Sequence, residues 1–289
     1  MFLSSQFFYF AGENRSPFRK YTAWKRYTLF ARDQWPLPDK ALYGSHPFYL
    51  AIDDDGDADK GSSAAVHGVF LFNSNAMDII TQPAPAITYR TIGGVLDFFL
   101  LLGPTAEEVL EQYHSLIGLP AMPPFWSLGF HLSRFGYQNL SNLERTYQRT
   151  KEAAIPYDVQ WTDIDLFQAN NDFTYDHQRF SGMPTFIEQL HSEGRRFVPM
   201  FDCGISAGES PPESYLPFKE GLEMDVFVRN STDQLFIGRV WNSQGRTVWP
   251  DFTHPNATRY WTRQFAAYHQ LIAFDGSWID MNGKDLIKC

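Results

Sequence analysis

The chain has 289 residues, of which 44% are hydrophobic and 17% aromatic, and its formal net charge is −9. This length can hold one large domain or two ordinary ones with a sizeable core. The negative charge argues against a nucleic-acid partner, which requires clustered Lys and Arg. The most apolar run, residues 95–102, is interrupted by Asp97 and is too short to span a membrane.

The N-terminal third of the chain is predicted to be an antiparallel β-sandwich. Short runs of aromatic and β-branched residues alternate there with Gly, Pro and Asn, which is the pattern of strands joined by turns. The clearest runs are residues 27–30, 47–52 and 69–72. Residues 1–10 are apolar but lack the basic residues of a signal peptide, so they are also expected to form a strand.

An acidic stretch, residues 53–61, lies between two of these strands. It has several carboxylates of a calcium-binding EF-hand loop. However, Lys60 stands where that pattern needs Gly, and Val66 stands where it needs a bidentate Glu. A solvated hairpin tip explains the stretch better than a calcium site.

After Gly103 and Pro104 the pattern changes to helices that alternate with strands. Thr105 can cap a first helix, which Gly118 and Pro120 end, and Ser141 with Glu144 forms a capping box for a second. The predicted strands are 125–131, 158–161, 196–201 and 278–279, and the helices between them are 141–154, 184–191 and 257–272.

Four strands joined by three helices predict a parallel sheet, which is half of an eight-stranded barrel. An open doubly wound sheet also fits the alternation. It lacks the Gly-rich phosphate turn after its first strand, so dinucleotide binding is not expected.

Three of the predicted barrel strands end in acids, namely Asp163 with Asp165, Asp202, and Asp280. A single acid at a strand end can be a plain cap of backbone N–H groups. Three acids are predicted on the rim where barrels build their active sites, and tryptophans lie in the same segments. This combination favours glycoside hydrolysis. That reaction uses one carboxylate to attack or stabilise an oxocarbenium-like transition state and a second to protonate the leaving oxygen.

Other uses of clustered acids are poorly supported. No His-x-x-x-His or Cys-x-x-Cys pair provides metal ligands, and no Gly-x-Ser-x-Gly turn indicates a serine nucleophile. The two cysteines, Cys203 and Cys289, do not form a disulfide framework.

The segment 275–282, Asp-Gly-Ser-Trp-Ile-Asp-Met-Asn, closely resembles the nucleophile segment of glycoside hydrolase family 31, in which the order is Trp-Ile-Asp-Met-Asn-Glu. Gly283 stands in the place of that Glu, and the remaining residues no longer follow the family. Upstream, residues 12–18, 42–50 and 68–77 resemble sandwich strands of the family, and residues 124–131 resemble its first barrel strand.

The resemblance implies two domains. Residues 1–103 would be part of the N-terminal β-sandwich, which is galactose-mutarotase-like in the family. Residues 104–289 would be the first four β/α units of the catalytic TIM barrel.

The resemblance also implies a set of site residues. Asp280 would be the nucleophile that forms a covalent glucosyl intermediate, and no metal would take part. The substrate-binding residues would be Asp33, Phe135, Asp163, Ile164, Trp241, Trp278 and Met281. Phe135 stands where relatives often carry Tyr or Trp, and Cys203 and Asn242 each replace a Pro of the family pattern.

The implied function is that of a retaining α-glucosidase that removes terminal α-1,4-linked glucose from malto-oligosaccharides or glycogen without a cofactor. Asp165 favours the lysosomal or digestive branch over the branch of the endoplasmic reticulum, which usually carries Glu there. A lysosomal or extracellular location is expected. The sequons at Asn14, Asn139, Asn230 and Asn256 agree with the secretory pathway, although sequons also recur by accident.

The family's acid/base Asp lies well downstream of its nucleophile, so this chain alone is expected to be an inactive fragment of the enzyme. Two alternatives stay open. The chain could be a carbohydrate-binding product without catalysis, or it could derive from a related α-xylosidase or glucan lyase that keeps the same nucleophile.

Overall fold

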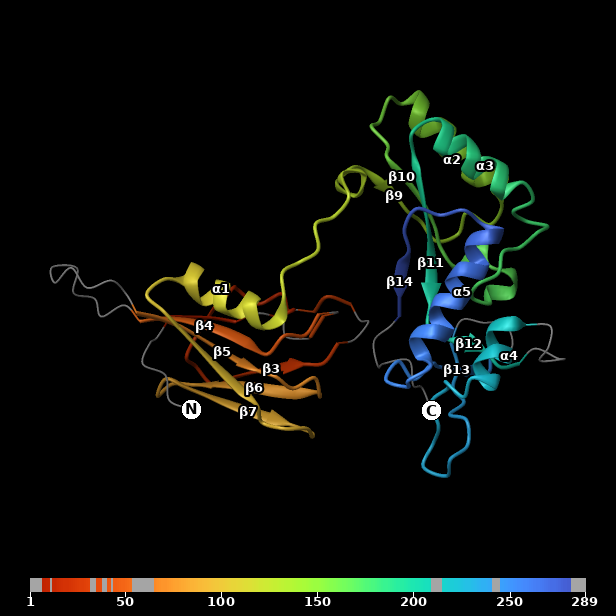
Figure 1. Ribbon diagram of the computed structural model, residues 1–289. Helices are drawn as coiled ribbons and strands as arrows, with labels where there is room; N and C mark the ends of the chain where they lie inside the picture. Colours follow the sequence, from red (N-terminus) through yellow and green to blue (C-terminus); the bar gives the residue numbers. More distant parts are fainter. Residues whose placement is uncertain are drawn as a thin grey trace. The chain divides into compact units, whose positions relative to one another are not determined.

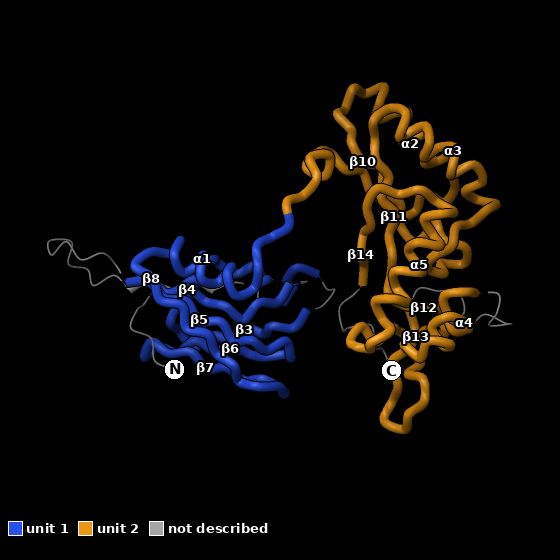
Figure 2. The backbone as a smooth tube through the Cα atoms, in the orientation of Figure 1, with its two compact units in different colours: residues 1–121, 283–285 blue, residues 122–282, 286–289 orange. Residues whose placement is uncertain are grey.

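The computed structural model describes residues 7–10, 12–31, 35–37, 41–42, 44–53, 65–208, 215–240 and 245–281. The described residues fall into two compact units, unit 1 up to Ala121 and unit 2 from Met122 onward (Figure 2). None of the described helices is both long and apolar enough to cross a membrane.

Unit 1 contains two antiparallel sheets (Figure 1). The larger has the strand order β2-β1-β4-β5-β8, and the smaller has the order β3-β6-β7. The strands are β1 (Phe7–Phe10), β2 (Arg19–Lys20), β3 (Lys25–Leu29), β4 (Phe48–Asp53), β5 (Ala65–Leu71), β6 (Met77–Gln82), β7 (Ala86–Thr91) and β8 (Phe98–Gly103). The runs 27–30, 47–52 and 69–72 are thereby confirmed as parts of β3, β4 and β5.

One buried cluster of unit 1 takes side chains from both sheets. Tyr49 and Val69 come from the larger sheet, and Leu29 and Ile79 come from the smaller one. Because successive side chains of a strand point to opposite faces, each strand contributes every second residue to this core. The strands β4 and β5 pair as a hairpin, and most of the acidic stretch between them lies outside the described residues.

Helix α1 (Ala106–Ile117) covers the larger sheet of unit 1. Thr105 caps it as predicted, because its side chain accepts a backbone N–H of the first turn. Val109 is fully buried, and the ring of Tyr113 stacks on Phe48 with 4.4 Å between centroids. The helix therefore completes the core of unit 1, whereas the sequence placed it at the start of the barrel.

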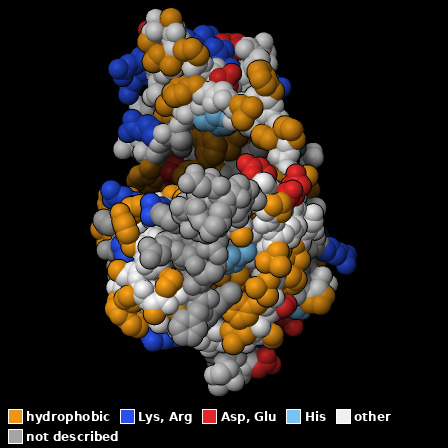
Figure 3. All heavy atoms as spheres, turned by 90° about the vertical axis from the view of Figure 1, so that its left-hand side faces the viewer, with side chains coloured by type: hydrophobic (Ala, Val, Ile, Leu, Met, Phe, Trp, Pro, Cys, Tyr) orange, Lys and Arg blue, Asp and Glu red, His pale blue; other side chains and the backbone are white. Residues whose placement is uncertain are grey.

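Hydrophobic side chains also reach the surface of the molecule (Figure 3). In unit 1 they include Leu100 and Leu102 of β8, whereas Leu101 between them is buried. An antiparallel sheet with one face in solvent usually alternates apolar and polar residues. The strand β8 departs from that alternation because both of its faces are apolar.

Unit 2 is built on a four-stranded parallel sheet with the order β9-β10-β11-β14, and its three long helices lie on one side of that sheet (Figure 1). Spatial order follows chain order, as in the first half of a β/α barrel. The elements are β9 (His131–Leu132), α2 (Leu140–Glu152), β10 (Val159–Thr162), α3 (Met183–Ser192), β11 (Arg196–Asp202), α5 (Ala257–Leu271) and β14 (Trp278–Asp280).

Short elements connect this framework. Between β11 and α5 lie the antiparallel pair β12 (Ile205–Ser206) and β13 (Thr247–Val248) and the helix α4 (Leu216–Glu223). Three 3-10 turns are η2 (Phe125–Leu128), η3 (Ile164–Leu166) and η4 (Gln168–Asn170).

The first predicted barrel strand is much shorter than expected. Residues 125–128 form the turn η2, because the backbone N–H and the hydroxyl of Ser127 both donate to the carbonyl of Pro124. Only His131 and Leu132 remain as the strand β9. An apolar run does not distinguish a strand from a turn that closes on a preceding proline.

The start of α2 also differs from the prediction. The cap is Asn139, whose Oδ1 accepts the backbone N–H of Asn142 at 2.9 Å, and Ser141 lies inside the helix. Asn is at least as good an N-cap as Ser, so the residue two positions earlier starts the helix.

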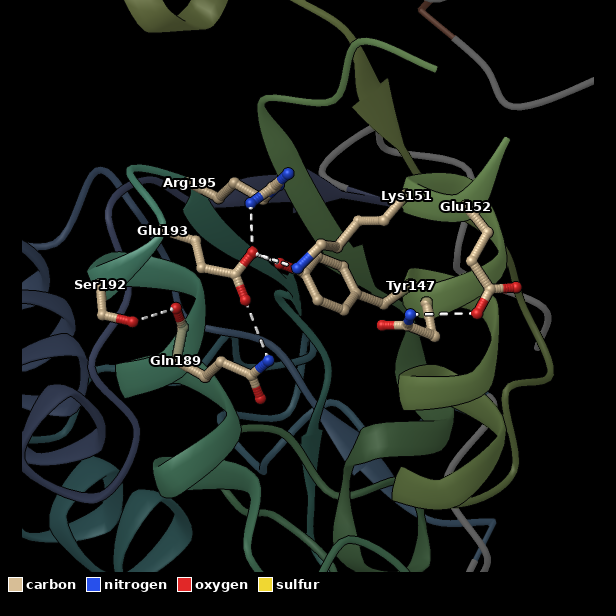
Figure 4. Close-up of polar contacts among 8 residues, drawn as sticks. Tyr147, Lys151, Glu152, Gln189, Ser192, Glu193 and Arg195 are labelled. Atoms are coloured by element: carbon tan, nitrogen blue, oxygen red, sulfur yellow. Dashed lines mark hydrogen bonds and ion pairs between the residues drawn. The ribbon is translucent and has the colours of Figure 1, made fainter. Parts of the chain in front are cut away.

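Glu193 joins α2 and α3 at the edge of the sheet where β11 begins (Figure 4). Its carboxylate accepts hydrogen bonds from Lys151 (2.6 Å), Tyr147 (2.6 Å), Arg195 (2.7 Å) and Gln189 (3.0 Å). Three of these donors, Lys151 first and then Tyr147 and Gln189, lower the pKa of Glu193 to about 2. The ionised carboxylate is therefore a stabilising tie between the two helices.

We expect Glu193→Gln to lower the free energy of unfolding by about 2 kcal/mol at neutral pH, because the amide keeps the shape but loses the charge that Lys151 and Arg195 face. The native pKa lies below that of the unfolded chain, about 4.3. The stabilisation is thus present above that value and is lost as the pH falls toward the native pKa. The difference between the variant and the unchanged chain should shrink steadily below about pH 4.5.

Urea unfolding followed by circular dichroism at several pH values measures this difference. Glu152→Gln is the matched control, because Glu152 is exposed and its carboxylate accepts a hydrogen bond from Gln148 at 3.1 Å, with no ion pair among the described residues. A loss at Glu193 that is equal at neutral and at acidic pH would show that the charge is not its cause.

Candidate active site

Acids from three neighbouring strands lie at the carboxyl edge of the parallel sheet in unit 2. The register pairs Asp202 of β11 with Asp280 of β14, which places their Cα atoms about 5 Å apart. Asp163 follows β10, whose last residue, Thr162, pairs with Pro199 of β11. The strand register therefore brings Asp163, Asp202 and Asp280 to one rim, as the sequence predicted.

Asp280 ends β14 as a half-buried residue. Trp278 points to the same face of the strand, and its ring lies 5.6 Å from that of Trp161 on β10. Met281 follows with φ +52°, a left-handed conformation that is uncommon for residues other than glycine. The carbonyl of Met281 accepts a hydrogen bond from the thiol of Cys203 at 3.3 Å, which holds this turn against the loop after β11.

A histidine fixes the aromatic wall next to Trp278. Trp161 Nε1 lies 2.9 Å from His131 Nδ1, and His131 Nε2 lies 3.0 Å from the carbonyl oxygen of Ser127. Because an indole N–H can only donate, Nδ1 is the acceptor and Nε2 carries the proton that Ser127 accepts. The neutral imidazole thus locks the ring of Trp161, on which Trp278 packs.

The loop after β10 contains three residues that the sequence singled out, and they have different roles. Asp163 is half-buried, its carboxylate accepts the N–H of Ile164 at 2.6 Å, and burial raises its pKa. Ile164 is 9% exposed and belongs to the hydrophobic core of unit 2. Asp165 is buried and accepts the N–H groups of Gln138 (2.7 Å) and Gly136 (3.4 Å), so it anchors the loop after β9.

Phe135 lies on the loop that Asp165 anchors, with 69% of its surface exposed. An open aromatic face is what packs against the apolar face of a pyranose ring. Two further predicted residues, Asp33 and Trp241, lie outside the described residues. The structure therefore groups Asp163, Trp278, Asp280 and Met281, places Phe135 on a neighbouring loop and puts Ile164 in the core.

Two acids behind the rim are almost fully buried. Asp202 is 4% exposed, and burial together with the charge of Asp280 raises its pKa to about 7. Asp172 is 2% exposed, and burial followed by the charge of Asp202 raises its pKa well above the usual range. Burial also raises the pKa of Cys203, so its thiol stays protonated and remains a donor.

Sequence reasoning missed Asp172 and His131. Asp172 lies in a loop between helical segments and gives no strand-end signal, and a lone histidine in an apolar segment carries no motif. The only available signal was the crowding of both residues with aromatic neighbours, which many core residues share.

Residues 120–288 match the family described as "Glycosyl hydrolases family 31 TIM-barrel domain", which is more than half of the chain. The chain belongs to glycoside hydrolase family 31. The resemblance expected from the nucleophile segment is thereby confirmed, and the parallel sheet of unit 2 is part of the family's TIM-barrel domain.

Among its relatives, lysosomal alpha-glucosidase of Mus musculus is 44% identical over 280 residues, which cover 97% of this chain and 28% of that protein. Intestinal sucrase-isomaltase of Homo sapiens is 43% identical over 284 residues, covering 97% of this chain and 15% of that protein. The chain thus spans less than a third of the length of these relatives.

Solved structures share the fold. The glucosidase II alpha subunit superposes with a TM-score of 0.79 at 24% identity, covering 96% of this chain and 31% of that one. The family 31 alpha-glucosidase from Bacteroides thetaiotaomicron superposes with a TM-score of 0.78 at 25% identity, covering 94% of this chain and 44% of that one.

The buried, protonated thiol of Cys203 should be inert toward thiol reagents in the folded chain. In a Cys289→Ser variant, where Cys203 is the one remaining cysteine of the sequence, we expect Ellman's reagent to react at least about a hundredfold more slowly than in the same variant unfolded in guanidinium. Equal rates in the two states would contradict the contact between Cys203 and Met281.

Proposed function

We propose that the protein is a retaining α-glucosidase and that Asp280 is its nucleophile. The observation that carries this proposal is the contrast between two neighbouring acids at the rim. Asp280 is half-buried beside Trp278, within a segment typical of the family, whereas Asp202 is buried and holds a proton near neutral pH. Asp280 is therefore the acid of this pair that can meet a substrate in its charged form.

In the proposed reaction the carboxylate of Asp280 attacks the anomeric carbon, the glycosidic bond breaks, and an acid protonates the departing oxygen. Water then attacks the glucosyl ester and releases Asp280. In retaining enzymes the second carboxyl lies roughly 5–5.5 Å from the first. Asp202 is too deeply buried to reach a leaving group, and Asp163 already caps η3.

We infer that the acid/base carboxylate belongs to a part of the protein outside this chain, because the relatives are several times longer than the region matched here. The 289 residues alone are accordingly proposed to be inactive. In the whole protein, unit 1 would be part of the antiparallel β-sandwich, and unit 2 would supply the first four β/α units of the barrel.

The proposed substrate is terminal α-1,4-linked glucose of malto-oligosaccharides or glycogen. The exposed ring of Phe135 and the half-buried ring of Trp278 suit a neutral pyranose, and Asp163 can accept hydrogen bonds from sugar hydroxyls. Asp33, Trp241 and Met281 complete the proposed pocket, whereas Ile164, which the resemblance also implied, lies in the core. The names of the relatives, lysosomal alpha-glucosidase and intestinal sucrase-isomaltase, support an α-glucoside substrate and a lysosomal or extracellular location.

A second candidate is a carbohydrate-binding chain without catalysis. It is favoured by the state of the acids around Asp280, since Asp202 is buried and Asp163 is used as a cap. Calorimetry of the 289-residue chain with maltose tests this candidate, because absent binding contradicts it. Release of glucose from maltose by the full-length protein also contradicts it, whereas both candidates expect no turnover by the 289-residue chain alone.

The proposed nucleophile is tested in the full-length protein that contains this segment. We expect Asp280→Asn to lower kcat/KM for maltose by at least about 10³-fold, because an amide cannot form the glycosyl ester. Asp251→Asn is the control, since the carboxylate of Asp251 closes a local turn by accepting the N–H of Thr253 (2.9 Å), and this variant should keep kcat/KM within about twofold. Activity that survives the Asp280→Asn substitution would refute the assignment.

A further inference from the structure

Behind the rim, Asp172 and Asp202 form a pair of buried acids that the proposed reaction does not use. Asp172 lies in the loop between η4 and α3, where the hydroxyl of Tyr215 donates to its backbone carbonyl at 2.8 Å. The neighbouring ring of Phe173 packs on Phe201 of β11 with 5.3 Å between centroids. The loop is thereby held against the end of β11, next to Asp202.

The surroundings of this pair offer little compensation for negative charge. Within the described part of the chain, no Lys, Arg or His forms an ion pair with Asp172 or Asp202. The titratable groups that face the pair are Asp280 of β14, Cys203 of the loop after β11, and Tyr260 and Tyr268 of α5. Each of these side chains is neutral when protonated and negative when deprotonated, so none of them supplies a positive charge.

Backbone N–H groups compensate only in part for the negative charge of these two acids. Asp202 Oδ1 accepts the N–H of Gly204 at 2.8 Å. The N–H groups of Asp202 and Phe173 favour the charged form of Asp172, yet both of its carboxylate oxygens lack a hydrogen bond of ordinary geometry among the described residues. Three carboxylates this close, two of them buried, cannot all ionise together, so protons must stay on the buried ones.

We propose that Asp172 and Asp202 are a proton-holding pair and that Asp202 is a positioning residue that sets the negative charge beside Asp280. While Asp202 keeps its proton, Asp280 is the charged member of the three. When the carboxyl group of Asp202 releases its proton to solvent, a second carboxylate adjoins the nucleophile. The pocket then gains affinity for positively charged sugar mimics, while neutral sugars are little affected. This inference rests on the proposed function of the rim as a sugar site.

The pH window follows from the pKa of Asp202, which lies at about 7, raised first by burial and then by Asp280. Burial and then the charge of Asp202 raise the pKa of Asp172 well above its usual range. The charge at Asp202 should therefore change around neutral pH. A cation bound about 5 Å from the carboxylate of Asp202 is strongly attracted to it, because the effective dielectric constant near a buried charge is well below that of water.

The first experiment measures inhibition of the active full-length enzyme by a permanently charged sulfonium analogue of glucose. The quantity of interest is the inhibition constant of the unchanged enzyme divided by that of Asp202→Asn. We expect this ratio to fall about tenfold between about pH 5.5 and pH 8, because only the unchanged enzyme gains the second carboxylate. A ratio that does not change with pH would overturn the proposal.

Asp176→Asn is the matched control for this experiment. Asp176 lies in the same loop as Asp172, but its carboxylate binds Arg179 (2.8 Å) and backbone N–H groups nearby. The inhibition constant of this variant should follow that of the unchanged enzyme at every pH. KM for maltose, a neutral substrate, should show no comparable dependence on Asp202.

The second experiment tests the pair by stability and needs no activity. Asp172 and Asp202 hold protons in the folded chain that an unfolded Asp, with a pKa of about 3.9, has already lost. Folding stability therefore falls as the pH rises from that value through the native pKa. The thermal midpoint should fall less between about pH 5 and pH 8 in Asp172→Asn and in Asp202→Asn than in the unchanged chain. If the thermal midpoint falls equally with pH in the variants and in the unchanged chain, the proposal that Asp172 and Asp202 hold protons is wrong.

The two proposals fail in different ways. An inactive full-length protein, or activity that survives Asp280→Asn, contradicts the proposed function, while the stability curves still report on the pair. An active enzyme that depends on Asp280 but shows a pH-independent ratio of inhibition constants contradicts the role of Asp202 alone.

Discussion

The parallel pairing of β11 with β14 is the constraint on which the candidate site depends. It fixes Asp202 and Asp280 side by side at the carboxyl edge of the sheet, about one strand spacing apart. Two carboxylates at that distance cannot share the same protonation state without cost. The fold treats the two differently, because it buries Asp202, which raises the pKa of that carboxyl, and leaves Asp280 half-buried.

The two edges of the same sheet treat acids in opposite ways. At the edge where β11 begins, Glu193 pairs with Lys151 and Arg195, and the donors Lys151, Tyr147 and Gln189 lower its pKa to about 2. At the other edge, Asp202 and Asp172 meet burial and further acids, which raise their pKa values. Lys151 and Arg195 thus bind Glu193 between helices and lie at the opposite edge of the sheet from the rim. This separation is typical of sites that give up stability to keep reactive charges apart.

The sequence predicted the parts of this arrangement that follow from periodicity and strand ends. The helices of unit 2 and the strands around 159–162, 196–202 and 278–280 have strong patterns, and the register of parallel strands then places their terminal acids together. Periodicity could not reveal that residues 125–128 turn instead of extending, because the turn rests on two hydrogen bonds from Ser127 to the carbonyl of Pro124. Nor could it place α1 on unit 1, since an amphipathic helix fits either neighbouring sheet.

The burial of Asp172 is the feature that no local rule could have supplied. Asp172 reaches β11 only because the loop after β10 packs Phe173 on Phe201 and Tyr215 holds the backbone of Asp172. That packing closes solvent off from Asp202 and adds a third acid behind it. Asp280, on the next strand, has Trp278 and the turn at Met281 as neighbours instead, and it keeps access to solvent. The contact between Phe173 and Phe201 thus helps to bury the two acids near the carboxyl end of β11, next to the rim that β11 forms with β14.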